Sequence, residues 1–174
     1  MYKLVSGGDW SITPNQYTIE PGKLTHSSKS NSTFGTAERI PTHQIMKFKA
    51  KVDNIGNGFI GYGIRAQASP TAVAWGGNSQ YIVIIKAKTI EFQKFGNTSV
   101  FVEYPNDCIF SGQTHEIEYS ALNNNNGSVD ITFKVDGRTI IEYNDNDEPI
   151  MPAGFFEVYA TERDCTIELT ADPE

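Results

Sequence analysis

Apolar and polar residues alternate along much of this chain, and no segment has the spacing of an amphipathic helix. Residues 45–53 alternate apolar side chains with lysines, and residues 128–135 alternate them with Asp130, Thr132 and Lys134. Successive side chains of a strand point to opposite faces, so this pattern predicts strands with one buried and one wet face. Many short strands without helices predict an all-β sandwich or barrel.

Three other segments are apolar almost throughout, at 58–66, 81–85 and 154–160. We expect these to be central strands, covered on both sides or using one face for binding. Asp136-Gly137 predicts a two-residue type I′ hairpin, because both of its central positions need positive φ. The expected strands are 3–5, 17–19, 23–27, 34–39, 45–53, 58–66, 80–86, 89–94, 99–104, 114–121, 128–135, 138–143, 153–160 and 164–170.

Length and charge narrow the possible partners. A chain of 174 residues suits one domain, so we expect a single domain over residues 1–174. The formal net charge of −7 argues against nucleic acid and against an anionic membrane surface as the main partner. The N-terminus lacks the apolar stretch of a secretory signal, and we expect the chain to be one part of a longer secreted protein.

Two features leave alternatives open. Cys108 and Cys165 are the only cysteines, and they are either two buried thiols or one disulfide that ties the last strand to a loop. The acidic segment 144–148 is either a solvated turn or a source of oxygen ligands for calcium. No cofactor is expected to be required, and a calcium ion bound there would have a structural role.

The order of these patterns points to a known superfamily. It is carried by GFIGYGIR at 58–65, HEIEYSA at 115–121, VDITFKVDGRTIIEYND at 129–145 and PAGFFEVYA at 152–160. Over residues 40–170 this order resembles the concanavalin A-like (laminin G-like) fold. The resemblance implies a two-sheet antiparallel β-sandwich of the jelly-roll type. The chain is similar, in this order of patterns, to the carbohydrate-binding modules of bacterial polysaccharide-degrading enzymes. The resemblance implies a polysaccharide or oligosaccharide ligand and a tethered catalytic domain.

No complete set of catalytic motifs from related sandwich enzymes occurs in the sequence. Retaining glycosidases need two carboxylates on one face, and laminarinase-like sandwiches supply them as Glu-x-Asp-x-x-Glu on one strand. Neither that motif nor the Arg-x-Glu-x-Arg strand of sandwich lyases occurs, and the Gln-x-His spacing of those lyases is met only by Gln113-Thr114-His115, which has no such arginine strand to complete it. We therefore expect a binding module rather than an enzyme. A sandwich glycoside hydrolase or polysaccharide lyase and an adhesion or structural module of a surface protein stay as alternatives.

Two side chains lead the expected ligand site. Sugars are bound by aromatic platforms together with a few planar polar groups. Trp75 lies in a glycine-rich loop, where it either contacts ligand or plugs the end of the sandwich. Arg65 shares a predicted face with Gly61 and Gly63, and it either bonds sugar hydroxyls or pairs with an acidic residue of a neighbouring strand.

Further candidates come from two other strands. An unpaired buried carboxylate is costly, so Glu157 predicts that its face of 154–160 is open, which places Tyr159 there too. Tyr81 belongs to one of two apolar sets on its strand, and either set can face the core. If Tyr81 shares the face of Arg65, these side chains converge into one hollow. The expected sugar-binding residues are Trp75, Arg65, Tyr81, Tyr159, Glu157 and Gln80.

Overall fold

The computed structural model describes residues 4–6, 17–20, 23–26, 32–43, 45–53, 55–56, 58–69, 78–161 and 165–169. Within these residues the chain forms fourteen β-strands. The same residues include no helix with the length and apolar character needed to cross a bilayer.

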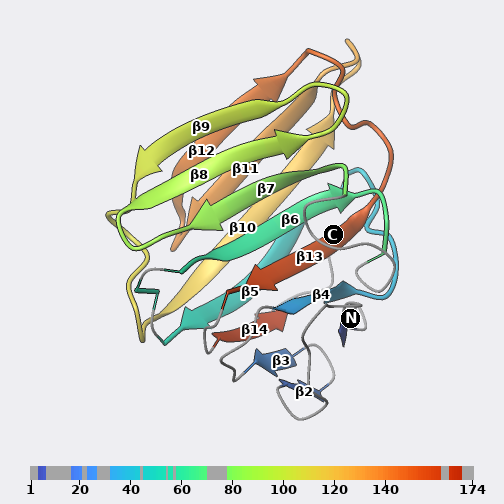
Figure 1. The fold of residues 1–174 in the computed structure, drawn as a ribbon. Helices are drawn as coiled ribbons and strands as arrows, with labels where there is room; N and C mark the ends of the chain where they lie inside the picture. The colour runs from blue at the N-terminus through green and yellow to red at the C-terminus, as the bar shows by residue number, and fades with distance from the viewer. Residues whose placement is uncertain are drawn as a thin grey trace.

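The strands form two antiparallel sheets that lie one over the other, with sheet A nearer the viewer in Figure 1. Sheet A has the order β1 (Leu4–Ser6), β4 (Ser32–Thr36), β13 (Phe155–Ala160), β6 (Ile60–Ala66), β7 (Gln80–Ile85), β8 (Thr89–Phe95) and β9 (Val100–Pro105). Sheet B has the order β12 (Arg138–Asp145), β11 (Val129–Val135), β10 (Thr114–Asn123), β5 (Ile45–Val52), β14 (Cys165–Leu169), β3 (Lys23–His26) and β2 (Tyr17–Glu20). The predicted two-sheet antiparallel sandwich is confirmed.

Aromatic side chains join the two sheets in the core. Phe48 of β5 lies 5.1 Å from Phe156 of β13 and 5.2 Å from Tyr62 of β6, measured between ring centroids. Both contacts are tilted, an arrangement that the ring quadrupoles favour. The alternation in residues 45–53 therefore has the predicted cause, since the apolar set faces the opposite sheet and the lysine set faces outward.

The Asp136-Gly137 hairpin also forms as predicted. Strands β11 and β12 pair Val135 with Arg138, which leaves two residues for the turn. Their φ angles are 50° and 80°, as a type I′ turn requires.

The interior also holds a buried ion pair near the end of β12. The Nζ atom of Lys94 lies 2.8 Å from Oδ2 of Asp145, and both side chains are fully buried. Lys94 also donates to the carbonyl oxygen of Asp147 at 2.6 Å and to Oγ1 of Thr98 at 2.7 Å. Three oxygens thus surround the buried ammonium, which compensates for its loss of water.

Candidate functional site

The outward face of sheet A carries an apolar cluster of its own, separate from the core. Ile82 and Ile84 of β7 and Tyr159 of β13 are buried there, with Phe59 and Phe95 packed against them. The rings of Phe59 and Tyr159 stack at 5.7 Å with an interplanar angle of 27°. The outward face of an antiparallel sheet is commonly polar, so this cluster distinguishes the face from a plain solvent surface.

Strand pairing aligns the outward side chains of sheet A in two rows. We call them the Glu157 row and the Glu91 row. The Glu157 row is Gly35, Glu157, Gly63, Ile82, Gln93 and Phe101. The Glu91 row is Thr33, Tyr159, Gly61, Ile84, Glu91 and Glu103. Each row therefore runs from β4 to β9 and combines aromatic, aliphatic and planar polar side chains.

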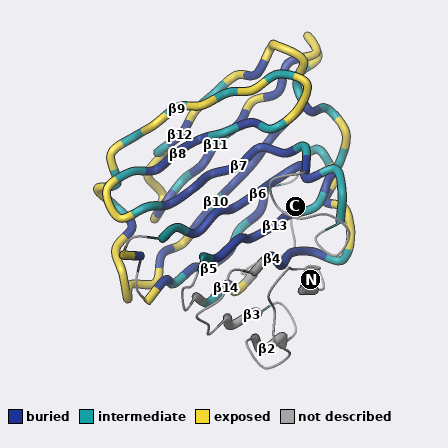
Figure 2. Tube along the Cα trace, in the orientation of Figure 1, coloured by how far each residue is buried: buried dark blue, intermediate teal, exposed yellow. Residues whose placement is uncertain are grey.

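The side chains of the two rows are buried at the β13 end and exposed to solvent at the β9 end. Strands β13, β6 and β7 are buried, whereas β8 and β9 become progressively exposed, as Figure 2 shows. Phe101 of β9 is 61% exposed and Glu103 is also exposed, while Gln93 beside them is half-buried. The described part of the face thus presents to solvent an aromatic ring next to an amide and a carboxylate.

Glu157 is a buried acid at the closed end of its row. Its Oε1 accepts a hydrogen bond from Nδ2 of Asn78 at 2.9 Å, and its Oε2 has no hydrogen-bond partner among the residues that the structure describes. Burial raises the pKa of Glu157 to about 8, although hydrogen bonds from Asn78 and Gln80 oppose the shift. The side chain is therefore mostly neutral near pH 7.

Gly63 makes room for these polar groups. A β-carbon at Gly63 would overlap Oε1 of Gln80 and would lie 3.6 Å from Cβ of Glu157. A glycine at this position therefore lets the Gln80 amide pack beside Glu157 on the outward face.

Glu91 differs from Glu157 in having strong partners. It forms an ion pair with Lys86, whose side chain is 43% exposed, and its Oε2 accepts a hydrogen bond from Nε2 of Gln93 at 2.8 Å. Glu103 lies directly opposite Glu91 on β9. This end of the face therefore carries two carboxylates, one ammonium and one amide.

Three of the predicted site residues lie on this outward face. Glu157 and Tyr159 alternate with Phe156 and Val158, which belong to the core, so their predicted direction is confirmed. Gln80 is on the same side of the sheet as Ile82. The prediction that this face is open at Glu157 and Tyr159 is wrong, however, because both side chains, like that of Gln80, are nearly closed to solvent. Trp75 lies outside the described residues, so its role stays a prediction.

Arg65 does not lie on the outward face, so its predicted direction is wrong. Its guanidinium is between the sheets, where Nη1 donates to Oδ1 of Asn123 at 2.7 Å and Nη2 donates to the carbonyl oxygen of Ala121 on β10. The other acceptors are the carbonyl oxygens of Thr42, Ile150 and Met151. Burial lowers the pKa of Arg65 to about 10, which leaves it charged at neutral pH.

Backbone conformation explains this reversal. Arg65 has a φ of 60°, and strand β13 opposite has a register shift between Phe155 and Glu157. A left-handed residue beside a bulge breaks the alternation of side chains, so Arg65 turns inward although Gly61 and Gly63 face out. The alternative prediction, an ion pair of Arg65 with an acidic neighbour, is also wrong, since all its acceptors among the described residues are uncharged oxygens.

Tyr81 also faces the core, and its predicted place in an open hollow is wrong. Its ring stacks on Phe92 at 6.2 Å, its hydroxyl donates to Oδ2 of Asp145 at 2.7 Å, and the amide of Ile150 donates to that hydroxyl at 2.8 Å. Tyrosine can be buried when its hydroxyl finds partners, and Asp145 supplies one here. The predicted convergence of Arg65, Tyr81 and Tyr159 does not occur.

Phe101 is the exposed residue that the sequence reasoning missed. It alternates with Val100 and Val102, which are partly buried, and shares its face with Glu103. The argument that assigned Glu157 and Tyr159 to an outward face applies equally to Glu103 and Phe101. That signal was present in residues 99–104.

Two open questions from the sequence concern the thiols and calcium. Cys108 is a free thiol in the structure. The carboxylate of Asp145 is engaged by Lys94 and Tyr81, and the described residues contain no cluster of three or more His, Cys, Asp or Glu side chains suited to a metal. Calcium at the acidic turn stays an untested prediction.

The spacing of Glu157 from Glu91 on the outward face does not match a glycosidase pair. Glu91 and Glu103 are closer, since they are opposite each other on neighbouring strands, but Lys86 and Gln93 already hold Glu91. Strand β7, at the centre, presents Gln80, Ile82 and Ile84 outward. Glu157 and Glu91 lie on β13 and β8, three strand steps apart, which is about 14 Å at the usual strand spacing. Glycosidase pairs are about 5 to 9.5 Å apart.

Comparison with known proteins identifies the fold but not a family. No family model matches the chain, and no curated protein matches its sequence. A carbohydrate-binding module, CBM66 of Bacillus subtilis, has a similar structure, with a TM-score of 0.64, 15% identity, and 97% of this chain and 94% of that chain covered. A β-glucanase of Bacillus licheniformis gives a TM-score of 0.65 at 10% identity, with 96% and 89% covered. Sheep galectin-11 gives 0.57 at 12% identity, with 84% and 98% covered. The chain has the concanavalin A-like β-sandwich fold.

Proposed function

We propose that this chain is a non-catalytic carbohydrate-binding module that binds a neutral glycan on the outward face of sheet A. The observation that carries the proposal is the exposed Phe101 ring, which lies beside Gln93 at the open end of the Glu157 row. The solved structures with this fold include a carbohydrate-binding module, glucanases and a galectin, which supports a carbohydrate ligand. A shared fold alone does not determine function, so the side chains must carry the argument.

The open end has the chemistry that a sugar ring requires. The apolar C–H face of a sugar stacks on an aromatic ring such as Phe101. Its equatorial hydroxyls need planar donors and acceptors at the edge of that ring. Gln93 lies opposite Phe101 on β8 and supplies an amide. Glu103 lies two residues from Phe101 on β9 and supplies an exposed carboxylate.

Charge favours a neutral ligand over an acidic one. Glu91 and Glu103 face outward here, and Lys86 is the one basic group paired with them among the described contacts. The chain as a whole carries a net charge of −7. Uronic or sulfated sugars would meet repulsion, and Arg65, once a candidate partner for such groups, lies between the sheets.

A binding role is favoured over hydrolysis by the placement of the acids. Glu157 has the raised pKa that a general acid needs, but the carboxylate of Glu91 is three strands away. In the nearer pair of Glu91 and Glu103, Lys86 and Gln93 already hold Glu91. We therefore assign glycan binding to the outward face of sheet A. We assign the reaction on the glycan to a catalytic domain of a larger secreted enzyme. That attachment is part of the proposal and follows from the resemblance.

Affinity electrophoresis against a panel of neutral and acidic polysaccharides tests this function. We expect retardation by at least one neutral glycan and a loss of affinity of about tenfold in Phe101→Ala, since an aromatic contact contributes about 1 kcal/mol beyond its buried area. Phe110→Ala is the matched control, because Phe110 is the other exposed large apolar side chain of the described part. Release of sugar from the bound glycan, or binding that survives Phe101→Ala unchanged, would contradict the proposal.

A further inference from the structure

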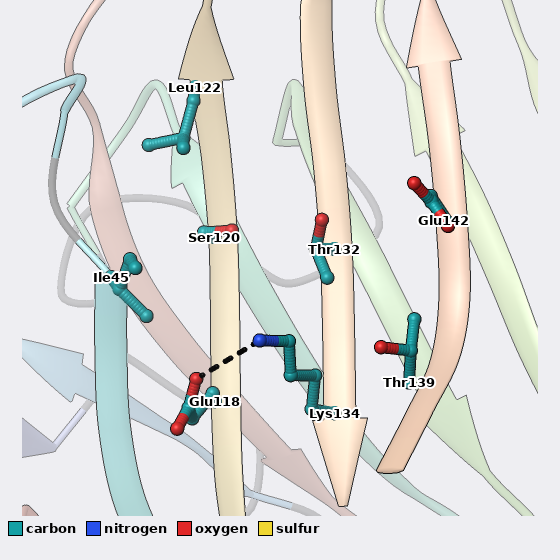
Figure 3. A pocket seen from close by; sticks show the side chains of 8 residues that line it. All are labelled: Ile45, Glu118, Ser120, Leu122, Thr132, Lys134, Thr139 and Glu142. Atoms are coloured by element: carbon teal, nitrogen blue, oxygen red, sulfur yellow. Dashed lines mark ion pairs between the residues drawn. The ribbon is translucent and has the colours of Figure 1, made fainter. Parts of the chain in front are cut away.

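A hollow lies on the outward face of sheet B, on the opposite side of the sandwich from Phe101. It has a volume of about 320 Å³ and spans strands β5, β10, β11 and β12. Its lining includes Ile45, Ser120, Leu122, Thr132, Thr139 and Glu142 (Figure 3). This volume is at the lower end of the range for small-molecule sites, about 300 to 1,000 Å³.

Strand register builds the hollow from one continuous row. Ile45, Ser120, Thr132 and Glu142 are directly opposite one another across β5, β10, β11 and β12. Paired polar side chains flank this row on both sides. Lys134 and Glu118 form an ion pair at 3.6 Å in the next row, and Nδ2 of Asn144 donates to Oδ1 of Asp130 at 2.6 Å in the other.

The central row of the hollow differs from the two flanking rows because its polar groups are free to bond a ligand. The hydroxyls of Ser120, Thr132 and Thr139 and the carboxylate of Glu142 have no hydrogen-bond partner within the described part of the chain. Half-buried Ile45 and Leu122 supply an apolar surface beside them. The hollow thus offers donors and acceptors next to an apolar floor.

We infer that this hollow is a second carbohydrate site, which takes one or two hexose units of a neutral glycan. Two carboxylates against one ammonium in the lining disfavour an anionic ligand. A polyol matches a row of hydroxyls, since each group can both donate and accept. Because the two faces point in opposite directions, the chain would hold two glycan strands at once and gain avidity on a polysaccharide surface.

Calorimetry with a short oligosaccharide of the retarding glycan tests the second site through its stoichiometry. We expect two sites per wild-type chain. The double variant Thr132→Val with Glu142→Gln should lose the sheet B site and keep one site. Thr114→Val is the matched control. Thr114 lies on the outward face of β10, the strand that contributes Ser120, but outside the hollow, so this variant should keep both sites.

The outcomes separate this inference from the proposed function. A single wild-type site that Phe101→Ala weakens, with the double variant unaffected, would overturn the second site and leave the proposed function intact. A site whose affinity Phe101→Ala leaves unchanged, and that the double variant loses, would support the second site. Circular dichroism of each variant checks that it is folded, so that a loss of binding reports on the site.

Discussion

Replacement of Lys94 by methionine should lower the free energy of unfolding by about 3–5 kcal/mol, the usual cost of removing one partner from a buried ion pair. Methionine is similar in length, so the main change is the loss of the ammonium that lies 2.8 Å from Asp145. Asp145 would then be a buried carboxylate whose remaining described side-chain donor is the Tyr81 hydroxyl. The carbonyl oxygen of Asp147 would lose its bond from Lys94 as well. Urea denaturation at neutral pH measures the effect.

Two controls make the Lys94 result specific. Lys86→Met breaks the ion pair with Glu91, but the Lys86 side chain is 43% exposed, so we expect a cost below about 1 kcal/mol. Lys94→Met combined with Asp145→Asn should be less destabilising than the sum of the two single changes, because the charges interact directly. A Lys94→Met protein within about 1 kcal/mol of wild type would show that the pair is not buried as described.

The stability of the protein should fall as the pH rises from about 5 to about 8, and Glu157→Gln should remove most of this fall. The pKa of Glu157 is raised from 4.5 to about 8 in the folded chain. Between these values the folded state binds more protons than the unfolded state, so stability decreases with pH. At about 1.36 kcal/mol per unit, the shift corresponds to a loss of up to about 5 kcal/mol above pH 8.

The measurement is thermal or urea unfolding at a series of pH values for wild type, Glu157→Gln and Glu103→Gln. Glutamine keeps the shape of a neutral acid and has no charge to bury, so its curve should be flatter between pH 5 and 8. Glu103→Gln should follow wild type, because the Glu103 side chain is exposed. Parallel curves for wild type and Glu157→Gln would mean that Glu157 titrates normally.

The strands could be predicted because alternation and turn chemistry are local signals. The apolar set of residues 45–53 and the Asp136-Gly137 turn both behave as their residue types dictate. The outward direction of Glu157 was predicted correctly, but for an incomplete reason. The carboxylate does not escape burial by facing outward, and it is instead held near Asn78 with a raised pKa.

The candidate site was harder to predict because it depends on tertiary contacts. The inward turn of Arg65 follows from its left-handed backbone and the bulge in β13. Neither can be predicted from the alternation of side chains along a strand. Tyr81 faces inward because Asp145, far along the chain, accepts its hydroxyl hydrogen bond. The hollow on sheet B depends on the register of four strands, which sequence alone leaves open.

Sugar recognition at the open end of sheet A can be located by an NMR titration of the isotope-labelled chain with the glycan that retards it in electrophoresis. We expect the largest amide shifts at Gln93, Phe101 and Glu103, and in Phe101→Ala the shifts on β8 and β9 should require about tenfold more glycan. If the amide resonances of β8 and β9 do not shift at saturating glycan, sugar binding at this end of sheet A is contradicted.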